Sequence, residues 1–165
     1  MLYSISKKDK SIKGSIHLPA SKSISNRVLI IQALCKEKFE INNLSEAQDT
    51  QILQNILANH KSQITNHKSQ IPVIDAGAAG TAFRFLTAFL ATQKGEWILT
   101  GSERMLQRPI KILVDALQQL GADIQYLKQK GFPPLKIKGT KLKSKEIFID
   151  GSVSSQYITA LLLIA

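Results

Sequence analysis

A lysine, a serine and an arginine stand together in the stretch "PASKSISNR" (19–27), directly ahead of an apolar run. Ser23 and Arg27 are four positions apart, so on a helix they share one face, with Lys22 just before its first turn. A cation beside an apolar surface needs an anionic partner, and the planar guanidinium of arginine suits a carboxylate or a phosphate. Because 22 basic residues face only 12 acidic ones, this stretch predicts a site for an external anion.

Two later stretches repeat the order of strand, turn rich in glycine or serine, and apolar helix. They are "DAGAAGTAFRFLTAFLA" (75–91) and "DGSVSSQYITALLLIA" (150–165). Unpaired N–H groups and the helix dipole favour an anion at each such helix start. In any one turn, Ser21, Thr81 or Ser154 is more commonly an ordinary helix cap. The recurrence in three turns nevertheless predicts phosphate binding.

Further cations lie close to these turns. Gly80 belongs to a run of small residues that lets backbone approach a ligand closely. Arg84, one helical turn later, either lines the same site or braces the loop from behind, and we favour bracing. Arg108 precedes Pro109, a natural first helical residue, so we expect Arg108 at a helix cap, where the dipole does not stabilise a cation. An anionic ligand would account for its position.

The elements that position these turns follow an α/β pattern with hairpins mixed among the crossovers. Apolar periodicity and turn residues predict strands at 11–18, 38–44, 71–77, 95–101, 123–128, 134–139 and 146–151. They predict helices at 23–35, 49–60, 81–92, 109–120 and from Ser154 onward. A length of 165 residues, 44% of them hydrophobic, is typical of one globular domain with a real core.

Composition narrows the classes of function. The formal charge of +10 suits a small anionic ligand, a nucleic acid or a solvated lysine face. Seven lysines within 128–145 largely alternate with apolar residues, which is typical of a half-buried strand, and only 6% of residues are aromatic, so we expect no nucleic-acid partner. No apolar run approaches the roughly 18 residues of a membrane span, no secretory signal is present, and the single cysteine fits a reducing cytoplasm.

The sequence gives little support for a metal site or a catalytic nucleophile. "NHKSQIT" (59–65) is followed by "NHKSQIP" (66–72), which sets His60 and His67 seven positions apart with no cysteine or carboxylate between them. We interpret this duplication as an expanded surface loop rather than a metal site. No Ser-His-Asp or Cys-His arrangement is evident, and the aspartates have no evident acid/base partner.

Four motifs in order, "LPASKSISNR", "DAGAAGTAFRFL", "TGSERMLQRPI" and "DGSVSSQYITALLL", closely resemble those of the 3-phosphoshikimate 1-carboxyvinyltransferases, or EPSP synthases. A sibling family that acts on a UDP-linked amino sugar normally has asparagine where Ser23 stands, which favours shikimate. The resemblance implies transfer of the enolpyruvyl group of phosphoenolpyruvate to the 5-hydroxyl of 3-phosphoshikimate. Phosphate leaves through a tetrahedral intermediate, and no metal or organic cofactor takes part.

The resemblance also implies a set of substrate-binding positions: Lys22, Ser23, Arg27, Gly80, Arg108, Ser154, Ser155 and Gln156. Lys22 would contact phosphoenolpyruvate close to the shikimate ligand, and Arg27, with Ser23, would hold the shikimate carboxylate. Gly80 and Arg108 would bind phosphoenolpyruvate, and the last three positions the 3-phosphate and the ring. Ala78 and Phe85 depart from the asparagine and proline of many members, from which we expect altered affinity rather than altered function.

Family members have two similar domains, each of three βαβαββ units with internal helices, an inside-out α/β barrel. The resemblance assigns 1–18 to a strand that joins the other, mostly absent domain. It assigns 19–165 to a truncated N-terminal substrate-binding domain with two units and the start of a third. The catalytic acid/base residues would lie in the missing portion, so we expect half a binding cleft that is inactive without a C-terminal portion or a complementing chain. The alternatives are a stand-alone anion-binding module and a relative of the UDP-amino-sugar transferases.

Overall fold

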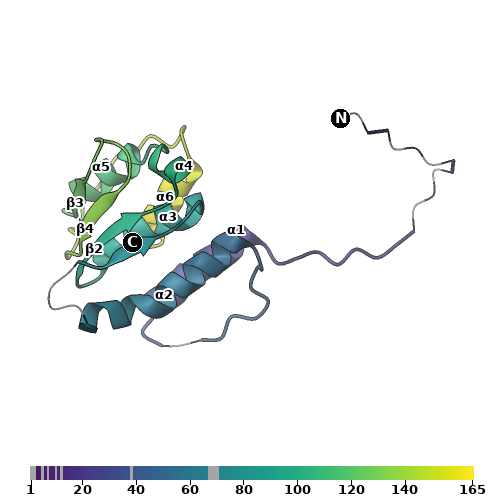
Figure 1. Ribbon diagram of the computed structural model, residues 1–165, viewed down its shortest axis with the longest axis horizontal. Coiled ribbons are helices and arrows are strands. Elements are labelled where there is room, and N and C mark those ends of the chain that lie inside the picture. Colours follow the sequence, from purple (N-terminus) through teal and green to yellow (C-terminus); the bar gives the residue numbers. More distant parts are fainter. Residues whose placement is uncertain are drawn as a thin grey trace.

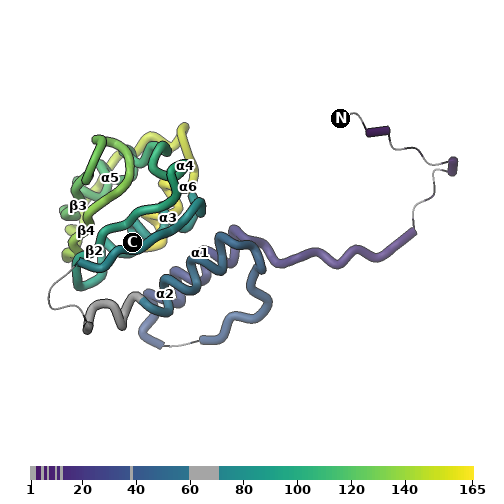
Figure 2. The backbone as a smooth tube through the Cα atoms, in the orientation of Figure 1, coloured from purple at the N-terminus to yellow at the C-terminus, as the bar shows by residue number. Residues whose placement is uncertain are grey.

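The computed structural model describes residues 3–4, 6, 8–9, 11, 13–37, 39–66 and 71–165, with only the backbone described for 60–66. Helices and strands form one body, and residues 13–20 lead away from it as an extended segment (Figures 1 and 2). Within the described residues, no helix is both long enough and apolar enough to cross a membrane.

A four-stranded mixed sheet forms the centre of the body. Its strands are β1 (Val73–Asp75), β2 (Glu96–Thr100), β3 (Asp123–Tyr126) and β4 (Leu135–Lys138), in the spatial order β1-β2-β4-β3. β1 and β2 are parallel, whereas β4 is antiparallel to both of its neighbours. With α3 (Gly80–Thr92) after β1, and α5 (Lys111–Gln119) after β2, this is one βαβαββ unit of the kind that the resemblance implies. The assignment of 19–165 to two units and the start of a third stays a prediction.

One face of the sheet is covered by helices, whereas the other carries charged side chains. Burial alternates along β2 and β4, with Trp97, Leu99, Leu135 and Ile137 buried on one face, where α3 and α5 pack. On the other face Lys136 forms an ion pair with Glu96, with 3.0 Å between Nζ and Oε1. The predicted lysine face is confirmed for β4, but the chain after Lys138 forms no strand.

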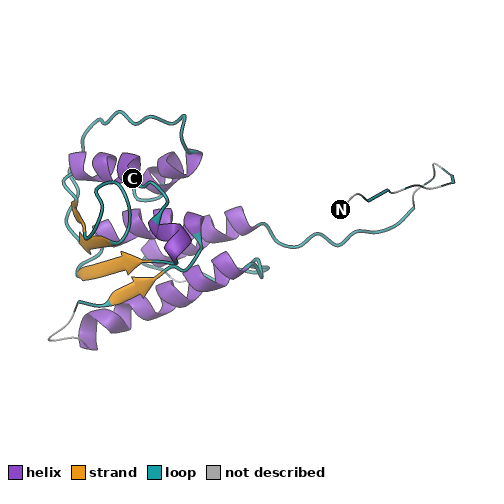
Figure 3. Cartoon of the chain, turned by 45° about the horizontal axis from the view of Figure 1, so that its top comes forward, coloured by secondary structure: helices purple, strands orange, loops and turns teal. Residues whose placement is uncertain are grey.

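Helix α3 is the internal helix of the body. Most of its side chains are buried, and it contacts the sheet as well as α1 (Lys22–Leu34), α2 (Gln48–Asn66) and α6 (Ser155–Leu162). The arrangement of helices around the strands is visible in Figure 3. Phe85 is 2% exposed, so its ring is part of this core. Burying a phenylalanine contributes about 1.5–3 kcal/mol.

Helices α1 and α2 pair through buried polar groups near their first turns. The Thr50 hydroxyl donates to Oδ1 of Asn26 at 2.9 Å, and the Ser25 hydroxyl accepts from the N–H of Ser45 at 3.0 Å. α2 continues to Asn66, so the expectation of a loop is wrong for the first copy of the duplication, which is helical. The described residues do not include the side chain of His60 or any part of His67.

Three strand predictions do not hold within this chain. The described parts of 11–18, 38–44 and 146–151 contain no strand, and Ile16 and Phe148 are 85% and 86% exposed. An alternating pattern forms a strand only when another strand accepts its backbone hydrogen bonds. None of the described residues pairs with these segments. The assignment of 1–18 to another domain stays a prediction.

Candidate functional site

The turns after the two parallel strands pack against each other. The N–H of Ser102, after β2, donates to the carbonyl oxygen of Gly77, after β1, at 3.0 Å. Gly101 approaches so closely that a Cβ there would lie 2.6 Å from the same oxygen. The carboxyl ends of parallel strands are where open α/β sheets bind ligands, so these turns mark the candidate edge.

The starts of α1 and α2 meet at the same edge. Nζ of Lys22 lies 3.1 Å from Oδ2 of Asp49, and the two side chains are 47% and 28% exposed. One turn further along α2, the Ile52 side chain lies 3.5 Å from where a Cβ on Gly77 would be. The first turns of α2 therefore connect Lys22 with the glycine turn that leads into α3.

Arg84 connects the start of α3 with the start of α6. Its Nη1 donates to the Gly80 carbonyl at 3.2 Å and to Oε1 of Gln156 at 2.8 Å. The guanidinium carbon lies 5.3 Å from the centroid of the Tyr157 ring, within the range of a cation–π contact. Arg84 thus braces the turn, which is the favoured of the two sequence interpretations.

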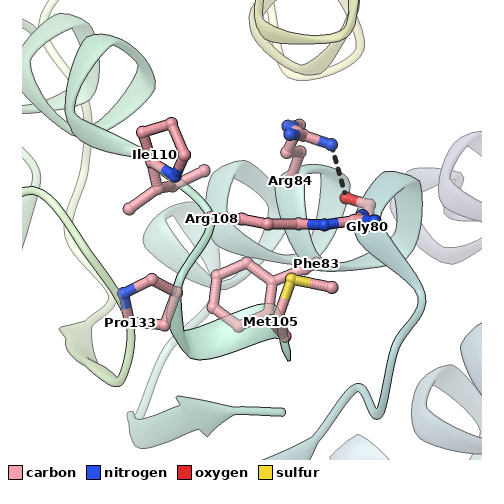
Figure 4. A pocket seen from close by; sticks show the side chains of 8 residues that line it. Gly80, Phe83, Arg84, Met105, Arg108, Ile110 and Pro133 are labelled. Atoms are coloured by element: carbon pink, nitrogen blue, oxygen red, sulfur yellow. Dashed lines mark hydrogen bonds between the residues drawn. The ribbon is translucent and has the colours of Figure 1, made fainter. Parts of the chain in front are cut away.

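Arg108 reaches Gly80 from another segment. A Cβ on Gly80 would collide with Nη1 of Arg108, so only glycine allows this approach (Figure 4). The expectation that Arg108 caps a helix over 109–120 is wrong, because α5 begins at Lys111 with Ile110 as its N-cap. The backbone of Arg108 instead follows the short helix α4 (Glu103–Leu106), and its N–H donates to the Met105 carbonyl at 3.0 Å.

The crevice behind these arginines is almost filled. It is lined by Gly80, Phe83, Arg84, Met105, Arg108, Pro109, Ile110 and Pro133, and its volume is about 10 Å³. That is room for one water molecule at most. Next to the crevice, the hydroxyl of Tyr157 donates a hydrogen bond to the carbonyl of the lining residue Pro109 at 2.7 Å. The crevice is therefore too small for a ligand larger than a water molecule.

The helix starts differ in their capping. Ser21 and Ser154 are side-chain caps that accept from the N–H groups of Ile24 and Gln156 at 3.4 and 3.3 Å. Thr81 is not a cap, because the N-cap of α3 is Ala79, which has no side-chain acceptor. Within the described residues, the first N–H groups of α3 have no partner. The start of α3 can therefore donate to an anion.

The titratable groups with shifted pKa values lie elsewhere or at the rim. Hydrogen bonds from the hydroxyl and the N–H of Ser152 lower the pKa of Asp150, which is fully exposed in the turn before α6. Burial, with a smaller contribution from Asp115, raises the pKa of Tyr126 on β3 to about 12. The described residues contain no group of three histidines, cysteines or carboxylates that could hold a metal ion.

Comparison with known proteins decides the family. The family model described as EPSP synthase (3-phosphoshikimate 1-carboxyvinyltransferase) matches residues 6–165. The chain belongs to the EPSP synthase family. The 3-phosphoshikimate 1-carboxyvinyltransferase of Bacteroides fragilis strain YCH46 is 53% identical over 153 residues, and the match covers 93% of this chain and 35% of that protein. That of Psychromonas ingrahamii is 44% identical over 172 residues, covering 93% and 40%.

A solved EPSP synthase shares the fold. The structure of EPSP synthase from Acinetobacter baumannii superposes with a TM-score of 0.78 at 23% identity, covering 92% of this chain and 38% of that one. The predicted α/β fold class of the family is thereby confirmed. The chain spans 35–40% of the length of these relatives.

Within this member of the EPSP synthase family, part of the predicted site is in contact. Arg108 reaches Gly80, and Arg84 joins Gly80 to Gln156. Ser154 caps α6 and Ser155 begins it, while Lys22 connects with the group through α2.

Ser23 and Arg27 are the outlying predictions. Both are exposed on α1, and no described contact joins either to the group around Gly80. Arg27 has no hydrogen bond or ion pair to any described residue. Its guanidinium is therefore free to meet an external anion, and the roles of these positions in binding stay predictions.

The sequence did not predict two residues that contact the candidate site, Asp49 and Tyr157. Asp49 has no evident partner in the sequence, because its contact with Lys22 spans 27 positions. Tyr157 reads as an ordinary apolar helix residue, yet it supports Arg84 and bonds the Pro109 carbonyl. An acidic residue in the first turn of a helix was the available signal for Asp49. No local pattern reveals the role of Tyr157.

Proposed function

We propose that this chain supplies substrate-binding turns for the transfer of the enolpyruvyl group from phosphoenolpyruvate to the 5-hydroxyl of 3-phosphoshikimate. The observation that carries the proposal is the uncapped start of α3, with Arg108 against Gly80 and Arg84 linking it to Gln156. The names of the relatives specify transfer of a carboxyvinyl group to 3-phosphoshikimate, and the resemblance of the ordered motifs supplies the donor and the residues.

Phosphoenolpyruvate binds at the start of α3 in this proposal. The free N–H groups there and the guanidinium of Arg108 provide donors for a phosphate or carboxylate. Lys22 contributes from α1. Its ammonium has three donors, so it can keep its bond to Asp49 and still donate to the substrate, and the exposure of the pair leaves room for this.

3-Phosphoshikimate binds between α6 and α1 in this proposal. Ser154, Ser155 and Gln156 at the start of α6 hold the 3-phosphate and the ring. Arg27 holds the carboxylate, with Ser23 beside it on the exposed face of α1. The two substrates together carry two phosphates and two carboxylates, which accounts for cations that the chain's few acidic residues leave unpaired.

The acid/base chemistry requires further polypeptide. The nearby carboxylates are engaged in holding the turns: Asp75 accepts from the N–H of Gly77 at 2.7 Å, and Asp49 pairs with Lys22. A C-terminal portion or a complementing chain would supply the proton-transfer groups. By covering this edge it would also exclude water and strengthen each charge contact.

Calorimetry and a phosphate-release assay on the purified chain test the proposal. We expect 3-phosphoshikimate to bind and no phosphate to be released from the two substrates together. Arg27→Ala should weaken 3-phosphoshikimate binding by about 1.5–3 kcal/mol, the range for a hydrogen bond between charged groups. Arg104→Ala, at an exposed arginine on α4, is the matched control and should leave affinity unchanged.

Other ligands separate the alternatives. A stand-alone anion-binding module would bind 3-phosphoshikimate but show no separate site for phosphoenolpyruvate. A UDP-amino-sugar transferase relative would prefer the UDP sugar, and a nucleic-acid binder would bind strands with a steep salt dependence. Preference for either of the latter ligands over 3-phosphoshikimate would reject the proposed function.

A further inference from the structure

Arg84 is held by more contacts than the packing of a helix requires. One nitrogen, Nη1, donates to both the Gly80 carbonyl and Oε1 of Gln156, and the guanidinium lies over the Tyr157 ring. Tyr157 is 1% exposed and fixed by its own bond to Pro109. Nε of Arg84 is buried and has no hydrogen-bond partner among the described residues. The guanidinium therefore has a defined position, at the cost of leaving one buried donor unsatisfied.

This position determines which way the amide of Gln156 faces. A guanidinium has donors only, so the atom of Gln156 that meets Arg84 must be the oxygen. The NH₂ group then lies on the other side of the amide. It has no acceptor among the described residues, and it is not among their buried unsatisfied atoms. Two N–H donors at the start of α6 are thus available to a ligand.

We propose that Arg84 is a positioning residue that fixes the amide of Gln156 with its NH₂ group presented to an anionic oxygen of the substrate. The identity of that ligand rests on the proposed function, whereas the orientation of the amide does not. Without Arg84 the amide could turn its oxygen toward the anion, which is repulsive. The same nitrogen also donates to the Gly80 carbonyl. Arg84 therefore links the turn proposed for phosphoenolpyruvate, at the start of α3, to the turn proposed for 3-phosphoshikimate, at the start of α6.

The orientation can be tested without any ligand, by NMR on the ¹⁵N-labelled chain. The steady-state heteronuclear NOE of the side-chain NH₂ reports its rigidity. We expect Gln156 to give values close to those of the α3 backbone. Gln125 is an exposed residue of β3 whose side-chain amide has no hydrogen bond to a described residue, so this amide is the internal reference and should be mobile. Equal mobility of the two amides in the unaltered chain would overturn the proposal.

Variants separate positioning from folding. Arg84→Met removes the guanidinium donors and should make the Gln156 side-chain amide as mobile as that of Gln125. Arg104→Met is the control and should leave the mobility of both amides unchanged. Arg84→Lys keeps a cation over Tyr157 and should restore part of the rigidity, and it replaces Arg84→Met should that variant not fold. A Gln156 amide that stays rigid in a folded Arg84 variant would contradict the proposal.

Binding of 3-phosphoshikimate provides a second, functional readout through a double-mutant cycle. We expect Arg84→Met and Gln156→Met each to weaken binding about tenfold, and the double variant to be within about twofold of the weaker single variant. A double variant that binds 3-phosphoshikimate about a hundredfold more weakly, the product of the two single losses, would show that the two residues act independently and would overturn the proposal. Failure of the unaltered chain to bind 3-phosphoshikimate would reject the proposed function instead, because the ligand-free NMR result still decides the role of Arg84.

Discussion

The βαβαββ unit over 71–138 and the segments 13–18, 39–44 and 146–151 have similar apolar patterns but different outcomes. In the unit, every predicted strand pairs, and residues such as Trp97 and Ile137 are fully buried. In the three segments the same alternation forms no strand: Ile16 and Phe148 are exposed, and Ile149 only packs against the edge of the core. The difference lies in the available partner rather than in the pattern, because a strand exists only as part of a sheet.

The comparison also explains where the candidate site lies. The turns at Gly77 and Gly101 follow strands that are paired within this chain, and their mutual contact fixes the start of α3. The site is therefore built on the complete unit, while α1 and α6 add their first turns to its edge. Phe148 lies in the segment before α6, so a segment without strand pairing leads directly into one of the candidate turns.

The largest expected contrast is between two phenylalanines. Phe89→Ala removes a fully buried ring from α3 and should lower the free energy of unfolding by about 3–5 kcal/mol through the cavity it leaves. Phe148→Ala removes an 86% exposed ring and should change it by no more than about 0.5 kcal/mol. Urea unfolding of both variants measures the contrast, and similar losses of stability would show that the Phe148 ring is buried in solution.

Two glycines allow the same comparison between the paired unit and the segment 13–18. A Cβ at Gly139, just after β4, would overlap the Gln93 carbonyl, so Gly139→Ala should cost about 1–3 kcal/mol of stability. Gly14 has nothing within 4 Å of its Cβ position, so Gly14→Ala should be close to neutral. Thermal unfolding ranks the two variants. A costly Gly14→Ala would mean that 13–18 is held against the body.

Gly80→Ala tests the contact at the site itself. Its methyl group would displace the Arg108 guanidinium, so we expect phosphoenolpyruvate to bind about 1–2 kcal/mol more weakly and 3-phosphoshikimate to be affected less. Calorimetry with each ligand measures the two losses. Gly151→Ala, whose Cβ would meet the end of the Ile158 side chain near α6, is the matched control and should spare phosphoenolpyruvate. Equal weakening of both substrates by Gly80→Ala would argue against this placement.

Replacing Tyr126 gives the smallest expected change in the free energy of unfolding at neutral pH. The change is visible mainly at alkaline pH. The pKa of Tyr126 is about 12 in the folded chain against 10.0 as the ordinary value, chiefly because of burial. The folded state therefore favours the neutral phenol, and this contribution is fully present below about pH 10 and lost as the pH rises toward 12. In Tyr126→Phe, unfolding curves should lack that part of the alkaline decline. At neutral pH the free energy of unfolding of the variant should equal that of the unaltered chain or exceed it by about 1 kcal/mol, because the buried hydroxyl has no hydrogen-bond partner among the described residues.

Tyr3→Phe, at a tyrosine that is 80% exposed, is the control and should retain the full alkaline decline. The same decline in Tyr126→Phe and in the unaltered chain would show that Tyr126 ionises as easily in the folded state as in the unfolded one.

Local chemistry in the sequence was enough to predict the elements of the complete unit and several ends of helices. Ser21 and Ser154 act as caps, and Gly121 ends α5 with a φ of +93°. The prediction failed where the outcome depends on distant partners. Thr81 lies inside α3, because the N-cap of this helix is Ala79, two residues earlier. The strand pattern of 38–44 has no strand to pair with among the described residues.

The candidate site shows the same division. Its residue types and helix starts were predictable, because anions favour arginines and free N–H groups wherever these occur. The contacts of Arg108 with Gly80, of Arg84 with Gln156 and of Lys22 with Asp49 join segments far apart in the chain. They follow from the packing of α2, α3 and α6, which no local pattern contains.

The most direct test of the account is an NMR titration of the ¹⁵N-labelled chain with 3-phosphoshikimate and then phosphoenolpyruvate. The account predicts saturable amide shifts that cluster at the starts of α1, α3 and α6, with Gly80 responding mainly to phosphoenolpyruvate and Gln156 to 3-phosphoshikimate. Shifts confined to the lysines at and after β4, or no saturable shift at all, would contradict it.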